Sequence, residues 1–312
     1  MSHTPASGAK QSAPIDIRRV RTLFSDPNRI ADSDFLRREI AGRMHERLAL
    51  VKIQPRQVLD AGCGEGADLS ALHQQYPDAG VLGVDASWPM LQQARARQAS
   101  AQSALNRLLS RMLPGRAGSP AQDNSLLCAD FAQLPLKPVS IDMIWSNLAL
   151  HWHPQPDRVF AEWRRVLRVD GLLMFSCFGP DTFKEVRNAF VAIDQTPHAL
   201  SFVDMHDFGD MLVDTGFSTP VMDMETITVT YESAEKLLAD IRAWGGNPLA
   251  SRRRGLLGRR SKGLLLEALE QNRGADGKLP LTFEIIYGHA FRPAPTKTSS
   301  GEAIIRFNPQ KR

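Results

Sequence analysis

The hydrophobic and polar positions alternate along most of the chain in a way that predicts an α/β protein. Apolar residues recur at helical spacing from Ser33 to Leu50, and beyond Val51 short apolar runs alternate with further helical patterns. We interpret the runs as buried strands of a parallel, doubly wound sheet, because helices between strands provide the crossovers that parallel strands need. The predicted strands are Gln57–Ala61, Gly80–Asp85, Ser125–Ala129, Ile141–Ser146 and Gly171–Cys177.

The second half of the chain combines further helical patterns with two long strand patterns. The segment between these two strands is about fifty residues long, which is too long for a hairpin, so we expect it to form a helical lid. The expected elements are helices at Pro180–Ile193, Asp204–Thr215, Ala234–Trp244 and Lys262–Gln271, and strands at Ser218–Tyr231 and Leu281–Arg292.

These patterns predict one domain with insertions. Residues 1–14 are rich in Ser, Ala and Gly, and we expect them to form a disordered leader. We expect residues 293–312 to form a flexible tail. Residues 15–292 form the expected domain. Within it, 99–124 ends in a run of Pro and Gly typical of a surface insertion, and 232–280 forms the lid.

A glycine-rich turn follows the first predicted strand. Asp60 precedes Gly62, Gly64 and Gly66, and a helical pattern begins directly after them. Glycine lets the backbone approach a ligand closely, and turns at the carboxyl ends of parallel strands bind ligands in such folds. The spacing differs from the G-x-G-x-x-G of dinucleotide sites, and the carboxylate of Asp60 favours a cationic ligand over a pyrophosphate.

Two further strand ends carry acids. Asp85 ends the second predicted strand, where a carboxylate can accept hydrogen bonds from both hydroxyls of a ribose. Asp130 and Phe131 close the third strand with an acid and an aromatic ring, which suit the amino edge and the face of an adenine. Turn residues alone would rarely produce this ordered set at three strand ends.

Together with Ser146-Asn147-Leu148 after the fourth strand, these motifs resemble those of class I S-adenosylmethionine-dependent methyltransferases. The resemblance covers the stretch from Val51 to Gly179. It implies a Rossmann-like seven-stranded sheet with its last strand antiparallel, and S-adenosyl-L-methionine as the cofactor. The antiparallel end agrees with the two long strand patterns late in the chain.

The same resemblance assigns roles to residues of the turn and the strand ends. It implies that Gly62 and Gly64 line the methionine moiety, that Asp85 holds the ribose, and that Asp130 and Phe131 contact adenine. The full set of expected cofactor-binding residues is Asp60, Gly62, Cys63, Gly64, Gly66, Asp85, Ala86, Asp130, Phe131 and Asn147.

The segment after the fourth strand lies where an acceptor would meet the sulfonium methyl group. His151 and His153 are candidate general bases there because the unperturbed pKa of histidine is near neutral, although a loop histidine more often forms a hydrogen bond or packs against its neighbours. Methyl transfer is an in-line displacement in which alignment and exclusion of water supply most of the acceleration, so a carboxylate acceptor needs no base. His151 and His153 lack further ligands nearby, and we expect no metal.

Further motifs resemble one subfamily, the malonyl-[acyl-carrier protein] O-methyltransferases of biotin synthesis. They are Ser146–Trp152, Phe178–Thr182 with Glu185–Arg187, Asp194–Phe202 and Leu281–Phe283. That family methylates the free carboxyl of a malonyl thioester, so the resemblance implies this reaction on malonyl-acyl-carrier protein or malonyl-CoA. An arginine is expected to hold the carboxylate in a bidentate contact, with Arg187 and Arg242 as candidates. Weak helix-surface ion pairs are the alternative role for both.

Two other functions stay open. The segment from Arg18 to Glu39 departs from the biotin family and resembles the mitochondrial complex I assembly-factor branch, which implies a hydroxylase or methylase that modifies a respiratory subunit. Both branches share the Phe178–Thr182 motif, whereas Pro197–Phe202 favours the biotin branch. A non-catalytic module that binds S-adenosylmethionine is the third function, and the intact glycines and Asp85 argue against it.

The net charge and its distribution limit the kinds of partner that we expect. Lys and Arg number 38 against 34 Asp and Glu, an excess too small for a nucleic-acid coat. The densest positive cluster lies in the lid, where it could steer an acidic acyl-carrier protein, with solvated helix ends as the alternative. No aromatic residues flank it, so we expect no nucleic-acid partner. Its members are Arg252, Arg253, Arg254, Arg259, Arg260 and Lys262.

Cysteine usage and hydropathy bear on the compartment. The three cysteines have neither disulfide-framework nor metal-ligand spacing, which favours a reducing environment. No apolar run approaches the length of a membrane span. We therefore expect a cytoplasmic enzyme without a membrane span.

Overall fold

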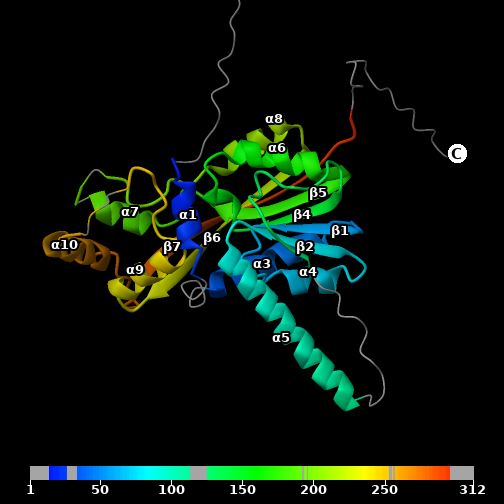
Figure 1. The fold of residues 1–312 in the computed structure, drawn as a ribbon. Coiled ribbons are helices and arrows are strands. Elements are labelled where there is room, and N and C mark those ends of the chain that lie inside the picture. The colour runs from blue at the N-terminus through cyan, green and yellow to red at the C-terminus, as the bar shows by residue number, and fades with distance from the viewer. Residues whose placement is uncertain are drawn as a thin grey trace, which may run out of the picture.

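The fold is built on one mixed sheet, shown in Figure 1. The computed structural model describes residues 14–26, 34–112, 125–191, 193–194, 196–252, 255 and 257–295. The sheet has seven strands in the order β3-β2-β1-β4-β5-β7-β6. Strands β1 to β5 pair in parallel, and β7 runs antiparallel to both β5 and β6. The strands are β1 (Gln57–Ala61), β2 (Gly80–Asp85), β3 (Ser125–Cys128), β4 (Ile141–Asn147), β5 (Leu167–Phe178), β6 (Ser218–Tyr231) and β7 (Leu279–Phe291).

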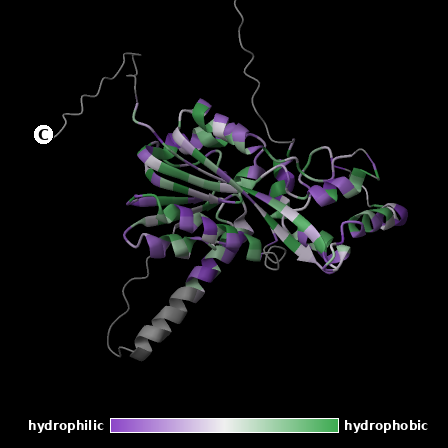
Figure 2. Cartoon of the chain, turned by 180° about the vertical axis from the view of Figure 1, so that it is seen from behind, coloured by the Kyte–Doolittle hydropathy of each residue, from purple (hydrophilic) through white to green (hydrophobic). Residues whose placement is uncertain are grey.

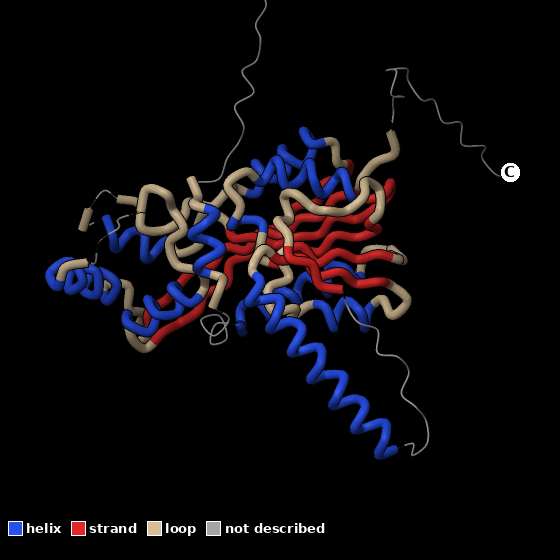
Figure 3. Tube along the Cα trace, in the orientation of Figure 1, coloured by secondary structure: helices blue, strands red, loops and turns tan. Residues whose placement is uncertain are grey.

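Helices cover both faces of the sheet, as Figure 3 shows. On one face lie α3 (Asp34–Ala49), α4 (Leu69–Gln75) and the first turns of α5 (Trp88–Met112), and on the other lie α6 (Pro156–Val166) and α8 (Met205–Thr215). Mainly hydrophobic residues run along the central strands, while the helices mix both kinds (Figure 2). The sheet is therefore the middle layer of three.

The two hydrophobic cores follow from the two-residue period of the strands. In β4, Met143 and Trp145 join the core under α3, whereas Ile144 between them joins the core under α6 and α8. Trp163 of α6 and Met44 of α3 are fully buried on their respective faces. Because both faces of the central strands are covered, these strands read as continuous apolar runs.

Short helices gather at one end of the sheet (Figure 1). They are α1 (Ile17–Leu23), η1 (Leu150–Trp152), α7 (Lys184–Val191), α9 (Ala234–Ala243) and α10 (Arg259–Glu270). The chain just before α1 pairs with the segment after α9 through an antiparallel bridge between Ile15 and Leu249, and Asp16 N–H donates to the carbonyl of Pro248 at 2.9 Å. The amino-terminal helix is thereby fastened to the expected lid segment.

Most predicted elements are confirmed, including the antiparallel last strand. The helix expected from Pro180 begins instead at Lys184, because Glu284 of β7 holds the preceding turn through Asp181 N–H (2.6 Å) and the Thr182 hydroxyl. The sequence patterns missed α1, a seven-residue helix capped by the side chain of Asp16.

Several boundary expectations fall largely outside the described residues. These are the leader, the second half of the insertion at 99–124 and nearly all of the tail. The first half of the expected insertion continues α5 as far as Met112.

Candidate active site

The glycine turn after β1 has positive φ angles, which favour glycine over residues with a side chain. Gly62, Gly64 and Gly66 have φ of 84°, 54° and 72°. A Cβ on Gly62 would lie 2.3 Å from the Cβ of Ala149, and one on Gly66 would lie 2.9 Å from Leu69 Cδ1. Gly62 and Gly64 line a cavity at the ends of β1, β2 and β4, whereas Gly66 packs against α4 and α5 beneath the turn.

We call this cavity the inner cavity. Its floor comes from the loops after β1, β2 and β4, and its cover comes from α1 and α3, including Val20, Phe24 and Arg37. The residues that line it at the strand ends and in the segments after them are Gly62, Gly64, Asp85, Ala86, Ser87, Phe131, Asn147, Leu148, Ala149, His151, Trp152 and Phe178. The amino-terminal segment thus forms part of the site, which the sequence motifs did not indicate.

Asp85 is the acid at the centre of the inner cavity. Its Oδ2 accepts from Gly64 N–H at 2.9 Å and its Oδ1 from Ser87 N–H at 2.7 Å. Burial raises the pKa of Asp85, although both backbone N–H groups favour its charged form. Each carboxylate oxygen keeps a lone pair, so the side chain can still accept hydrogen bonds from two ligand hydroxyls.

Two expected cofactor residues lie beneath the turn. Asp60 is buried, its Oδ2 has no hydrogen-bond partner among the described residues, and burial with the nearby carboxylates of Asp68 and Asp85 raises its pKa well above the usual value. Cys63 is also buried, and burial raises the pKa of its thiol. With Gly66, they support the turn rather than line the inner cavity.

Asp130 and Asn147 are both engaged with protein groups. Asp130 accepts from Ala132 N–H at 2.9 Å and pairs with Arg21 of α1 at 3.3 Å. Its neighbour Phe131 lines the cavity, whereas Asp130 does not. Asn147 lines the cavity and donates to Asp68 Oδ2 at 3.1 Å. These bonds fix the cavity wall in place.

His151 lines the inner cavity but does not have the properties of a general base. Its Nδ1 accepts from the backbone N–H of Phe178 at 3.3 Å, so the proton of the neutral ring sits on Nε2. Burial lowers the pKa of His151 to about 3. A ring with so low a pKa is mostly neutral near neutral pH and a weak proton acceptor, which argues against a general base at this position.

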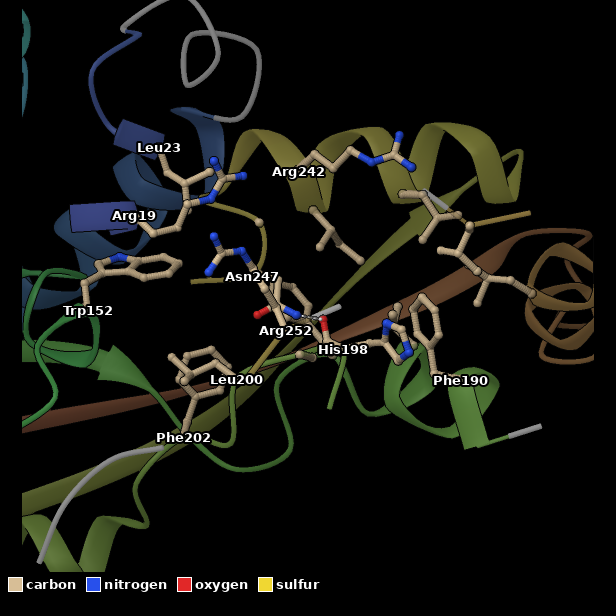
Figure 4. A pocket seen from close by; sticks show the side chains of 18 of the residues that line it. Arg19, Leu23, Trp152, Phe190, His198, Leu200, Phe202, Arg242, Asn247 and Arg252 are labelled. Carbon is tan, nitrogen blue, oxygen red and sulfur yellow. Dashed lines mark hydrogen bonds between the residues drawn. The ribbon is translucent and has the colours of Figure 1, made fainter. Parts of the chain in front are cut away.

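A larger outer cavity of about 820 Å³ adjoins the inner one, and Trp152 lines both. Figure 4 shows its wall, which combines apolar side chains with three arginines. The apolar members include Leu23, Phe183, Val186, Phe190, Leu200, Phe202, Leu238 and Leu265, and the polar ones are Arg19, His198, Arg242, Asn247 and Arg252.

The arginines of the outer cavity differ in direction. The side chains of Arg19 and Arg252 enter the cavity on the side where Trp152 lies, whereas Arg242 extends along α9 away from Trp152 (Figure 4). The Nε of Arg19 is buried without a hydrogen-bond partner in the described structure. Arg252 donates to the carbonyl of Leu249 at 3.0 Å. Sequence motifs did not indicate Arg19, and its place in the wall follows only from the fold.

Arg187 lies outside both cavity walls. Its guanidinium donates to the backbone carbonyls of Pro180 and Thr182 in the turn before α7, and burial lowers its pKa. The expectation that Arg187 holds an acceptor carboxylate is therefore not supported by its position, because its donors are occupied by its own turn.

One member of the basic cluster, Arg252, lines the outer cavity. Arg259, Arg260 and Lys262 are exposed on α10, the helix whose Leu265 lines this cavity. Arg253 and Arg254 lie outside the described residues. Within the described ranges, no group of three or more His, Cys, Asp or Glu side chains is arranged to hold a metal ion, and no helix is long and apolar enough to cross a membrane.

We expect Gly62→Ala to lower both the stability and the ligand affinity of the chain. A positive φ costs a non-glycine residue about 1–2 kcal/mol, and the overlap with Ala149 adds to this. Gly42→Ala on the exposed side of α3, where a Cβ meets nothing within 4 Å, should instead raise the unfolding free energy by about 0.5–1 kcal/mol. Urea unfolding of both variants measures the difference, and a Gly62→Ala variant as stable as the parent would contradict the close approach.

A Rossmann-like sheet with a reversed last strand, a glycine turn after β1 and an acid at the end of β2 define a class I S-adenosylmethionine-dependent methyltransferase. The family model described as "Methyltransferase domain" matches residues 59–175. The YcgJ protein of Bacillus subtilis shares the fold, with a TM-score of 0.54 and 16% identity over 83% of this chain and 100% of that one.

Full-length relatives identify the subfamily. The malonyl-[acyl-carrier protein] O-methyltransferase of Laribacter hongkongensis is 46% identical over 94% of this chain and 96% of its own length. The protein of the same name from Gallionella capsiferriformans is 44% identical with the same coverage. The chain belongs to the malonyl-[acyl-carrier protein] O-methyltransferase family.

The residues of the inner cavity fit S-adenosylmethionine, the methyl donor of this class. Gly62 and Gly64 expose backbone where a side chain would obstruct the ligand, and Asp85 retains acceptor capacity for ribose hydroxyls. Phe131 and Met90 supply apolar surface for a base. Arg37 also lines the cavity, and its guanidinium forms ion pairs with the carboxylates of Asp34 and Glu65.

Proposed function

We propose that this chain methylates the free carboxylate of a malonyl group carried as a thioester on an acyl-carrier protein, an early step of biotin synthesis. The observation that carries the proposal is the outer cavity, where apolar walls lead to two arginines beside the inner cavity. In a malonyl thioester, the arm that carries the thioester would lie along the apolar walls and the terminal carboxylate would meet the arginines. The names of the full-length relatives support the same substrate.

S-adenosylmethionine, when bound, supplies an electrophilic methyl group on a sulfonium. In the proposed mechanism Asp85 holds the ribose, and Gly62 and Gly64 leave room for the methionine portion. Arg19 and Arg252 hold and orient the malonyl carboxylate through charge-assisted hydrogen bonds. Because a carboxyl group is already ionised at neutral pH, the acceptor needs no base.

Exclusion of water completes the proposed mechanism. Trp152, Phe178 and Phe202 form apolar surface around the place where the two cavities adjoin. A dry junction strengthens the contacts of the arginines with the carboxylate and keeps the acceptor aligned with the methyl group. Alignment and charge thus account for the rate without a covalent intermediate on the protein.

Carrier recognition and location form the finer part of the proposal. The exposed Arg259, Arg260 and Lys262 lie on α10, the helix whose Leu265 lines the outer cavity, and they would attract an acidic carrier protein over a long range. Cytoplasmic action agrees with the free thiols of all three cysteines.

The test is formation of a methyl ester. The chain is incubated with S-adenosylmethionine labelled in its methyl group and with malonyl-carrier protein, and base-labile label on the carrier is counted. We expect ester on malonyl-carrier protein and none on acetyl-carrier protein, which has the same thioester but no carboxylate. Loss of the gene should make cells require biotin.

A failure of this test would favour the alternative function. If malonyl-carrier protein acquires no ester while a respiratory subunit acquires a methyl or hydroxyl group, the chain is a protein modifier of the assembly-factor kind. The segment from Arg18 to Glu39, on which that resemblance rests, contributes α1 and α3 to the cavity walls.

A further inference from the structure

His151 stands in the wall between the two cavities. It belongs to η1, directly after the loop that ends β4, and only 4% of its surface is exposed. Three aromatic rings surround it, with centroid distances of 4.8 Å to Trp152, 4.5 Å to Phe178 and 5.5 Å to Phe202. Phe178 lines the inner cavity, Phe202 the outer one and Trp152 both. His151 thus lies where donor and acceptor would meet.

The two ring nitrogens of His151 differ in their bonding. Nδ1 accepts from Phe178 N–H, which leaves the proton of the neutral ring on Nε2. Nε2 is buried and has no partner in the described part of the chain. A buried donor without an acceptor is costly and rare in folded proteins, so it calls for an explanation.

We propose that the Nε2–H of His151 donates a hydrogen bond to the acceptor carboxylate and thereby selects an ionised acceptor at the methyl-transfer site. The inference rests on the proposed function and adds a residue role to it. A negatively charged oxygen is the strongest acceptor that such a donor can find. Binding of the carboxylate would therefore give the buried Nε2–H of His151 an acceptor.

The role requires no proton transfer. One carboxylate oxygen forms a bond to the methyl carbon, the carbon–sulfur bond breaks, and its electron pair remains on sulfur. The acceptor loses one negative charge and the sulfonium loses its positive charge, so the balance closes without a base. His151 keeps its Nε2–H throughout.

The other titratable groups on the cavity walls are placed for different tasks. Both oxygens of Asp85 face the glycine turn and Ser87. His198 bonds to Asp194 at 2.7 Å and lies beside Phe190, at the end of the outer cavity away from Trp152 (Figure 4). Among the described residues that line the two cavities, His151 is the histidine in contact with Trp152, the residue that lines both.

Two substitutions separate the two ring nitrogens. His151→Gln places an amide N–H near the position of Nε2 and gives up the acceptor at Nδ1, whereas His151→Asn keeps a polar group near Nδ1 and gives up Nε2–H. We expect kcat/KM for malonyl-carrier protein to stay within about 5-fold of the parent in His151→Gln and to fall roughly 10- to 100-fold in His151→Asn.

Thermal melting and calorimetric titration with S-adenosylmethionine establish that both variants fold and bind the cofactor. A merely structural role for His151 predicts the reverse order, because His151→Gln is the variant that loses the bond to Phe178. A greater or equal loss in His151→Gln would overturn the proposal. A parent protein that forms no malonyl ester would instead overturn the proposed function itself, and the two failures are distinguished by which protein is inactive.

Discussion

Asp85→Ala is expected to raise the dissociation constant for S-adenosylmethionine at least roughly 100-fold. Two hydrogen bonds from ribose hydroxyls to a charged acceptor would be lost, each with a contribution of about 1.5–3 kcal/mol. The backbone N–H groups of Gly64 and Ser87 would lose their acceptor at the same time, which loosens the turn itself. Isothermal titration calorimetry measures the effect directly.

The matched control for this substitution is Asp223→Ala. Asp223 is exposed on β6 and pairs with Arg47 at 2.6 Å, outside the lining of both cavities. We expect the affinity of the Asp223→Ala variant for S-adenosylmethionine to remain within about 2-fold of the parent, since exposed ion pairs contribute little to stability. Equal affinities in Asp85→Ala and the parent would mean that the ribose does not bind at the end of β2.

Arg19→Gln is expected to lower kcat/KM for malonyl-carrier protein roughly 10- to 100-fold, because hydrogen bonds to a charged group are strong and Arg19 has an unpaired Nε in the outer wall. Cofactor affinity should change little, since Arg19 lines the outer cavity and not the inner one. Initial rates at varied malonyl-carrier concentration, with cofactor titration alongside, separate the two effects.

Arg18→Gln is the control on the same helix. Arg18 is exposed and lies outside both cavity walls, so its removal changes the net charge equally without touching the acceptor site. Similar losses in both variants would indicate general steering of an acidic carrier by charge, and an unchanged rate in Arg19→Gln would contradict a carboxylate contact at this residue.

The sheet and the cofactor side of the site could be predicted from sequence because their signals are local. Buried parallel strands appear as continuous apolar runs, and the ligand-facing turns follow directly after them. Gly62, Asp85 and Phe131 each sit at such a strand end, so the topology alone brings them to one edge. Asp60 and Cys63 share this position in the chain, but their side chains point into the protein, which a pattern of residue types does not distinguish.

The acceptor side depends on contacts between distant segments. α1 has seven residues and gives too short a periodic signal, yet it places Arg19 in the outer wall through the bridge between Ile15 and Leu249. Arg187 occurs in a family motif, but its guanidinium closes the turn before α7. The ordinary pKa of histidine makes His151 a candidate base, whereas the burial of its ring in the fold lowers that pKa to about 3, which a residue pattern does not reveal.

The most direct test of the account is a crystal structure of the chain with S-adenosylhomocysteine and malonyl-CoA. We expect the ribose to lie at Asp85 and one malonyl carboxylate oxygen to lie within about 4–5 Å of the sulfur, at the distance that leaves room for a methyl group in near-attack geometry. The other carboxylate contacts should be Arg19 and His151. A malonyl carboxylate bound elsewhere, with the junction at Trp152 closed by side chains, would contradict the account.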